Sequence, residues 1–211
     1  MTRLQRAALL AFCTHIVAGL TLALVLRHGL ETNPDLQDRL AFLVNHRALW
    51  TLAWLPWTIS AVAILYFYMT FAEVHGLKSS LPIFLTVIAL APDLAAEAIE
   101  IGVLPQVAAD ALSHNAPFEL FMTLHRIAVM LSGYLANGLY SATATILAWF
   151  ARRAYPTWLS AAGISIGILG GAASIAALLD SVTGLFSTNA LLVPCILLWL
   201  GGVAKYRVKE L

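Results

Sequence analysis

Charged residues are scarce in this sequence, at 11% of 211 positions, whereas a typical soluble domain carries about a quarter. Hydrophobic residues instead make up 61% of the chain and gather in long runs. This balance predicts an integral membrane protein. Because the runs lack the alternating pattern of a barrel strand, the predicted fold class is all-α, a polytopic bundle of transmembrane helices.

Cysteine, lysine and net charge are also low, and each shortage argues against a class of function. The two cysteines, Cys13 and Cys195, both fall in apolar runs, which argues against a disulfide framework and against a thiolate site. No lysine lies inside an apolar run, so a retinal Schiff base has no candidate. A net charge of +1 offers no case for nucleic-acid binding. The P-loop, HExxH and CxxC motifs are absent.

Six apolar runs are long enough to cross a hydrocarbon core of about 30 Å. Arg3 and Arg6 precede the first run, which is longer than a signal-peptide core and is interpreted as an uncleaved span. The fourth run exceeds one crossing, so its first turns are expected to project from the membrane or to lie in the interface. The chain is therefore predicted to be one six-helix transmembrane domain over residues 1–211, with spans at about 7–26, 49–72, 80–103, 120–150, 157–179 and 187–204.

Basic residues favour one orientation of these spans. The positive-inside rule places both termini in the cytoplasm, because the inner side then holds Arg3, Arg6, Lys78, Arg152, Arg153, Lys205, Arg207 and Lys209. The outer side holds only Arg27, Arg39, Arg47 and Arg126. Most polar residues at membrane depth then lie in the outer half, so a site is expected to open outward.

An acidic stripe in the third span is the first candidate for chemistry. Asp93, Glu97 and Glu100 recur at i, i+4 and i+7, and a helix would place them on one face. A carboxylate in hydrocarbon costs a few kcal/mol and persists where it faces a bundle interior, a cavity or a partner. Asp93 is the deepest and follows Pro92, so Asp93 and Glu97 are the candidate catalytic acids, with Glu100 as a candidate substrate-binding residue.

A tryptophan stripe in the second span has the same spacing. Trp50, Trp54 and Trp57 are expected at the levels of Glu100, Glu97 and Asp93, if residues rise by about 1.5 Å each along antiparallel helices. Indole faces and carboxylates together suit a positive charge. The alternative is an interfacial aromatic belt, although Trp57 is rather deep for one.

Two His-Arg pairs enter the membrane from the outer side. Arg47 and Arg126 are the expected partners of the acidic stripe, either as purely structural ion pairs or as groups that orient the acids. Two arginines cannot neutralise all outer carboxylates, so at least one carboxyl is expected to be protonated or reserved for a ligand. His46 and His125 are interpreted as interfacial residues, as metal ligands or as axial haem ligands. No cofactor is predicted, and haem or a metal ion is kept as an alternative.

Polar and small residues complete the candidate set. Tyr134 and Asn137 in the fourth span would orient a ligand or bridge helices. Gly163, Gly167 and Gly171 in the fifth span form two linked small-xxx-small steps, which predict a packing face within the bundle or between copies in a homo-oligomer.

Residues 46–58, with the sequence HRALWTLAWLPWT, resemble the second span of a family of six-span bacterial membrane proteins of unknown function. The resemblance implies a multi-pass protein of the bacterial inner membrane. It supplies no activity and no catalytic residues.

These residues lead to three functional hypotheses. The first is a membrane-embedded enzyme, of an isomerase or cyclase type, whose acids act on a lipophilic, isoprenoid- or lipid-like substrate in an outward-facing pocket. The second is a proton-coupled transporter of organic cations, and the third is a haem- or metal-binding membrane protein. A structural subunit whose charges merely pair is the remaining alternative.

Overall fold

The computed structural model describes residues 1–77 and 79–206, which form helices joined by short links and contain no strand. The predicted all-α class is therefore confirmed. Lys78, Arg207 and Lys209, which contributed to the predicted orientation, lie outside the described residues.

The long helices are interrupted in two places by π-helical turns. The turn η2 (Ile99–Val103) joins α4 to α5, and the turn η3 (Met130–Ala136) joins α6 to α7. A single 3₁₀ turn, η1 (Leu26–His28), follows α1. The α-helices are α1 (Arg3–Leu24), α2 (Leu36–Asn45), α3 (Arg47–Val74), α4 (Leu81–Ala98), α5 (Leu104–Leu112), α6 (Phe118–Val129), α7 (Asn137–Phe150), α8 (Thr157–Leu178) and α9 (Val182–Lys205).

Side chains at several helix starts explain where the helices begin. Thr2 and Gln5 form a capping box at the start of α1. The Asp35 carboxylate accepts a hydrogen bond from the Asp38 amide at the start of α2, and Ser181 caps α9 in the same way. Prolines do not end the helices in the middle of the bundle, because α3, α4 and α9 each continue through one.

Within the described residues, five helices are long and apolar enough to cross a membrane. They are residues 3–28, 47–74, 81–112, 157–178 and 182–205. The predicted fourth span, 120–150, corresponds to the continuous helical segment α6–η3–α7 but is not among the five. Its hydroxyl and amide side chains lower its hydropathy, and they include Ser132, Tyr134, Asn137, Tyr140, Ser141, Thr143 and Thr145. Six crossings therefore stay a prediction.

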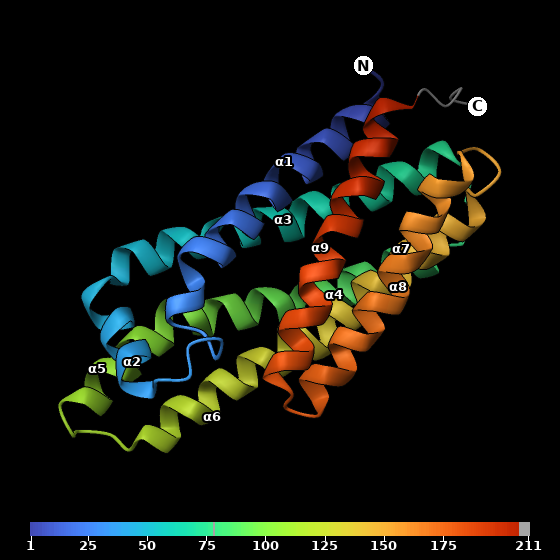
Figure 1. Ribbon diagram of the computed structural model, residues 1–211. Coiled ribbons are helices and arrows are strands. Elements are labelled where there is room, and N and C mark those ends of the chain that lie inside the picture. Colours follow the sequence, from blue (N-terminus) through green and yellow to red (C-terminus); the bar gives the residue numbers. More distant parts are fainter. Residues whose placement is uncertain (78, 207–211) are drawn as a thin grey trace.

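Six long helical segments of the described chain pack side by side in a closed ring (Figure 1). In the order of their contacts, the ring runs α1, α3, α4, α7, α8, α9 and back to α1. Both described ends, at α1 and α9, lie at one end of the bundle, here called the terminal end. The opposite end, here called the loop end, carries α2, α5 and the start of α6.

The buried apolar residues form two separate clusters along the bundle. The terminal-end cluster includes Phe67, Phe71 and Trp199. The loop-end cluster includes Trp50 and Phe121. Each of the two clusters contributes some of its own residues to the lining of one central cavity. The cavity therefore lies between two well-packed regions.

The glycine stripe of α8 is largely occupied by packing inside the chain. A Cβ atom on Gly163 would lie 2.5 Å from the Ala148 Cβ atom, and one on Gly167 would clash with the Thr145 Oγ1 atom. Such approaches require glycine, and they let α8 lie close to α7. A Cβ atom on Gly171 would meet open space. The homo-oligomer predicted through this stripe stays a prediction.

Candidate functional site

A cavity of about 260 Å³ lies at the centre of the helical ring. Residues of all six ring segments line it, from Leu30 at the loop end to Tyr68 and Trp199 toward the terminal end. The described residues that line it include the three carboxyl groups of the acidic stripe but no lysine or arginine. The cavity therefore holds three acids, and the one basic side chain among its described lining residues is the imidazole of His15.

Asp93 and Glu97 each receive a hydroxyl hydrogen bond from a neighbouring helix. The Ser132 hydroxyl of η3 donates to the Asp93 Oδ1 atom at 2.7 Å. The Thr58 hydroxyl of α3 donates to the Glu97 Oε2 atom, and Glu97 is buried. The two carboxyls also interact with each other electrostatically. Two predicted catalytic acids thus share one cavity, each oriented by a different helix.

Two of the three predicted tryptophans face this cavity. Trp54 and Trp57 line it from α3, and neither indole N–H finds a partner among the described residues. A buried donor without a partner is costly, so these two groups are available to a ligand or to water. Trp50 is fully buried and instead donates its indole N–H to the Glu100 carbonyl oxygen at 2.7 Å.

The fourth predicted span contributes one of its two named residues. Asn137 lines the cavity and donates to the Gly170 carbonyl oxygen at 3.2 Å. Tyr134 is exposed on the outside of the bundle and does not line the cavity. Tyr140 lines the cavity, and its hydroxyl lies near Asp93 without completing a hydrogen bond within the described residues.

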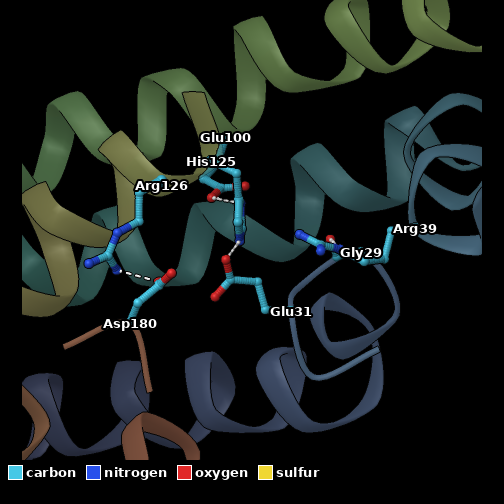
Figure 2. A network of polar contacts seen from close by, with 7 residues as sticks. All are labelled: Gly29, Glu31, Arg39, Glu100, His125, Arg126 and Asp180. Atoms are coloured by element: carbon cyan, nitrogen blue, oxygen red, sulfur yellow. Dashed lines mark hydrogen bonds and ion pairs between the residues drawn. The ribbon is translucent and has the colours of Figure 1, made fainter. Parts of the chain in front are cut away.

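Glu100 belongs to a buried charge cluster at the loop end of the cavity (Figure 2). Its Oε1 atom lies 3.1 Å from the Nδ1 atom of His125, which is 1% exposed. The other ring nitrogen of His125, Nε2, lies 3.8 Å from the Oε1 atom of Glu31. Glu31 is less deeply buried, with 17% of its side chain exposed, so the cluster extends from the cavity to the surface.

Arg39 supplies a buried cation to this cluster. Its Nε atom donates to the Gly29 carbonyl oxygen at 3.2 Å, and its guanidinium lies over the Phe121 ring. Burial lowers the pKa of Arg39, and the Glu31 and Glu100 carboxylates oppose that shift. The guanidinium remains charged, because its ordinary pKa lies far above neutrality.

Arg47 and Arg126, the cations expected for the acidic stripe, lie elsewhere. Arg47 is exposed at the start of α3. Arg126 pairs with Asp180 at 2.8 Å and donates to the Leu178 carbonyl oxygen, which ties α6 to the end of α8 (Figure 2). The expected pairing of Arg126 with the stripe is therefore wrong: neighbours on α6 differ by about 100° in direction, and it is His125 that points to Glu100.

The two π turns place polar groups on the elements that form the site. Glu100 lies in η2 and Ser132 lies in η3. A π turn inserts one extra residue into an α-helix, and such turns occur frequently at functional sites. Glu100 reaches His125 and also lines the cavity that Asp93 and Glu97 line.

Several residues of the site carry no strong signal in the sequence. Glu31 and Arg39 lie in the predicted first outer loop, and only the amphipathic pattern of residues 36–45 hints that Arg39 is turned inward. Thr58 lies one turn beyond Trp54, on the face of the tryptophan stripe. Ser132 is one hydroxyl among several in its helix, and nothing in its spacing distinguishes it.

The two histidines named as metal or haem ligands, His46 and His125, lie in different environments. His46 is exposed at the junction of α2 and α3, whereas both ring nitrogens of His125 face carboxylates. Among the described residues, no three His, Cys, Asp or Glu side chains are grouped as a metal site would need. Haem or metal between His46 and His125 stays a prediction of the sequence alone.

Comparison of the chain with protein-family models, with curated proteins and with solved structures finds no match. The resemblance of residues 46–58 to a bacterial six-span family therefore stays a prediction, and function has to be argued from the cavity.

Proposed function

We propose that this protein is a membrane-embedded acid–base enzyme that acts on a lipophilic, isoprenoid- or lipid-like substrate within the central cavity. The observation that carries the proposal is the pairing of Asp93 and Glu97 in one cavity whose described lining residues include His15 but no lysine or arginine. Two like charges in an apolar cavity repel each other strongly. A pair that shares one proton offers one acid and one base side by side.

The rest of the lining supports a substrate with an apolar body. Most of it is aliphatic or aromatic, for example Ile64, Leu192 and Ile196. The indoles of Trp54 and Trp57 offer electron-rich faces to a developing positive charge and unpartnered N–H groups to a substrate oxygen. The volume of about 260 Å³ suits a compact substrate or the reactive end of a longer lipid.

Isomerisation of a double bond is the simplest reaction that this set can perform. The protonated carboxyl of the pair gives its proton to one alkene carbon, so that a C–H bond forms and the carboxyl O–H bond breaks. The carbocation lies against the indoles of Trp54 and Trp57. The other carboxylate removes a proton from a neighbouring carbon, and a new double bond forms. The pair ends with one proton, as it began, and no further reagent is consumed.

Deuterium incorporation tests this function even when the product is unidentified. Purified protein in D₂O is incubated with defined isoprenoid lipids, and mass spectrometry records deuterium on carbon. We expect incorporation with the wild type and a loss of about 10²-fold or more in Asp93→Asn and Glu97→Gln, as for removal of a general acid or base.

Glu119→Gln is the matched control, because Glu119 is an exposed acid at the loop end and its replacement should leave incorporation unchanged. Equal incorporation by the wild type and both amide variants would reject the proposed function.

A proton-coupled carrier of organic cations is the second candidate. The depth of the cavity favours it, because the lining reaches Tyr68 and Trp199 on the terminal-end side. Uptake of tetraphenylphosphonium into proteoliposomes under a proton gradient, lost in Asp93→Asn, would support the carrier over the enzyme.

A further inference from the structure

A continuous line of proton-binding groups connects the loop-end surface to the central cavity. It begins at Glu31, whose side chain is partly exposed, and passes through the imidazole of His125. It ends at Glu100, which is 3% exposed and also lines the cavity. The Glu100 Oε2 atom has no hydrogen-bond partner among the described residues, so one carboxylate oxygen is free to pass a proton onward.

We infer that Glu31, His125 and Glu100 form a proton relay that exchanges protons between the water at the loop end and the acids of the cavity. The inference deepens the proposed function, on which it rests for the acids Asp93 and Glu97 as recipients. It assigns a task to three residues that the proposed reaction itself does not use.

Each nitrogen of His125 lies near one carboxylate, and neither completes a hydrogen bond among the described residues, so a transfer needs a small motion of the side chains or a water molecule. The Glu31 carboxyl gives a proton to Nε2 across 3.8 Å, directly after a small side-chain motion or through one water molecule. The imidazolium then releases its Nδ1 proton to the Glu100 Oε1 atom at 3.1 Å. The ring is left with its proton on Nε2, and the starting tautomer returns when Nε2 releases that proton to the Glu31 carboxylate and Nδ1 takes up a proton from a water molecule.

The carboxylates on both sides of His125 stabilise the imidazolium that forms during the transfer. Glu31 approaches it from the link after η1, and Glu100 approaches from η2. Arg39 of α2 interacts with both carboxylates and keeps part of their charge compensated. Arg126 on α6 itself is engaged by Asp180. The Phe121 ring stacks beside the imidazole in a nearly parallel plane, so the path is shielded by an apolar side chain.

Infrared spectroscopy tests the relay independently of catalysis. Protein in liposomes is switched from H₂O to D₂O, and the carboxylic C=O band is followed in time, with Asp93→Asn and Glu97→Gln assigning the cavity acids. In His125→Gln we expect exchange of that band to slow by about 10²-fold, the low end of what a positioned proton-transfer group contributes. His114→Gln is the matched control, because His114 is an exposed histidine at the loop end.

Two more variants separate a relay from a structural role, since His125 is buried and its replacement puts folding at risk. Glu31→Gln changes only the partly exposed entry group and should also slow exchange, whereas Glu119→Gln should not. Added imidazole should restore exchange in His125→Ala, because a free imidazole can enter the vacated space.

Exchange at the wild-type rate in both Glu31→Gln and a folded His125 variant would overturn the relay. A purely structural role of His125 would also overturn the relay. It would show as slow exchange in His125→Gln, no rescue of His125→Ala by imidazole, and normal exchange in Glu31→Gln. The wild type could also exchange fast, lose that fast exchange in the Glu31 and His125 variants, and yet incorporate no deuterium into lipids. That result would support the relay and reject the proposed enzyme, so the two failures are distinguishable.

Discussion

Arg39 is the buried cation that balances the loop-end charge cluster. Its side chain is 4% exposed and lies close to the Glu31 and Glu100 carboxylates. Moving three charged groups out of water is costly, and the arrangement is stable only while opposite charges compensate one another. The stability of the cluster should therefore respond more to loss of this one residue than to loss of any exposed arginine.

We predict that Arg39→Gln destabilises the folded protein by about 3 kcal/mol, because it leaves the buried Glu100 carboxylate and the partly exposed Glu31 carboxylate without this cation. Arg47→Gln is the control, since Arg47 is an exposed arginine at the same end and should lose less than about 0.5 kcal/mol. The free energy of unfolding in detergent measures both. Equal losses would show that Arg39 does not balance the cluster.

Among the helical elements, the π turn η3 sets how α6 and α7 share the site. On the α6 side, His125 reaches Glu100. On the α7 side, Asn137 and Tyr140 face the cavity. A regular α-helix from 118 to 150 would rotate one half by about 100° relative to the other, since each residue turns by that angle, and both sets could not face inward.

Deletion of Gly133 should convert η3 into regular α-helix and separate these two sets. We expect the variant to remain helical by circular dichroism but to lose deuterium incorporation or cation uptake, whichever activity the wild type shows. Gly133→Ala is the control. Its Cβ atom would lie 3.4 Å from the Ala177 Cβ atom, an ordinary contact, so activity should persist. Full activity in the deletion variant would show that η3 does not orient the site.

At the scale of the whole bundle, the closed ring of helices leads us to predict an even number of membrane passes. Both described ends lie at the terminal end (Figure 1), and the ring closes only because the segment α6–η3–α7 runs the full length back to that end. If this segment crosses the membrane despite its polar side chains, the two termini lie on the same side.

Single cysteines at Thr2, at His114 and at Lys205, in a chain whose Cys13 and Cys195 are replaced by serine, test this topology. We expect a membrane-impermeant maleimide to label His114→Cys from the outside of intact cells and the two terminal positions only after lysis. Labelling of Thr2→Cys and Lys205→Cys from opposite sides would show that residues 118–150 do not cross.

Local patterns predicted the broad architecture because they depend on short stretches of chain. The apolar runs located five helices that the structure confirms as long and apolar enough to span a membrane. The i, i+4 spacing of Asp93 and Glu97 placed both acids on one face, and the structure lines one cavity with both. The expected level of Trp50 with Glu100 followed from helical rise alone, and the Trp50 indole N–H donates to the Glu100 carbonyl oxygen.

Which cations lie near the acidic stripe depended on the packing of helices that are far apart in the sequence. The sequence pointed to Arg47 and Arg126 as cations for the stripe, but the structure places His125 beside Glu100 and gives Arg39 an electrostatic interaction with it. Arg39 comes from the helix α2 in the predicted first outer loop, for which a short surface helix was one expectation, and π turns interrupt the helices that carry Glu100 and Ser132. A π turn has no residue signature comparable to the proline or glycine signals of other breaks.

Hydropathy and helical periodicity are properties of neighbouring residues, so they were enough to predict a helical membrane protein with carboxyl groups at membrane depth. The packing of the helices was needed to show that all three carboxyls line one central cavity and that Glu100 also interacts with a buried histidine and a buried arginine. That arrangement follows from how six helical segments close into a ring and from two inserted residues, and no local pattern specifies either.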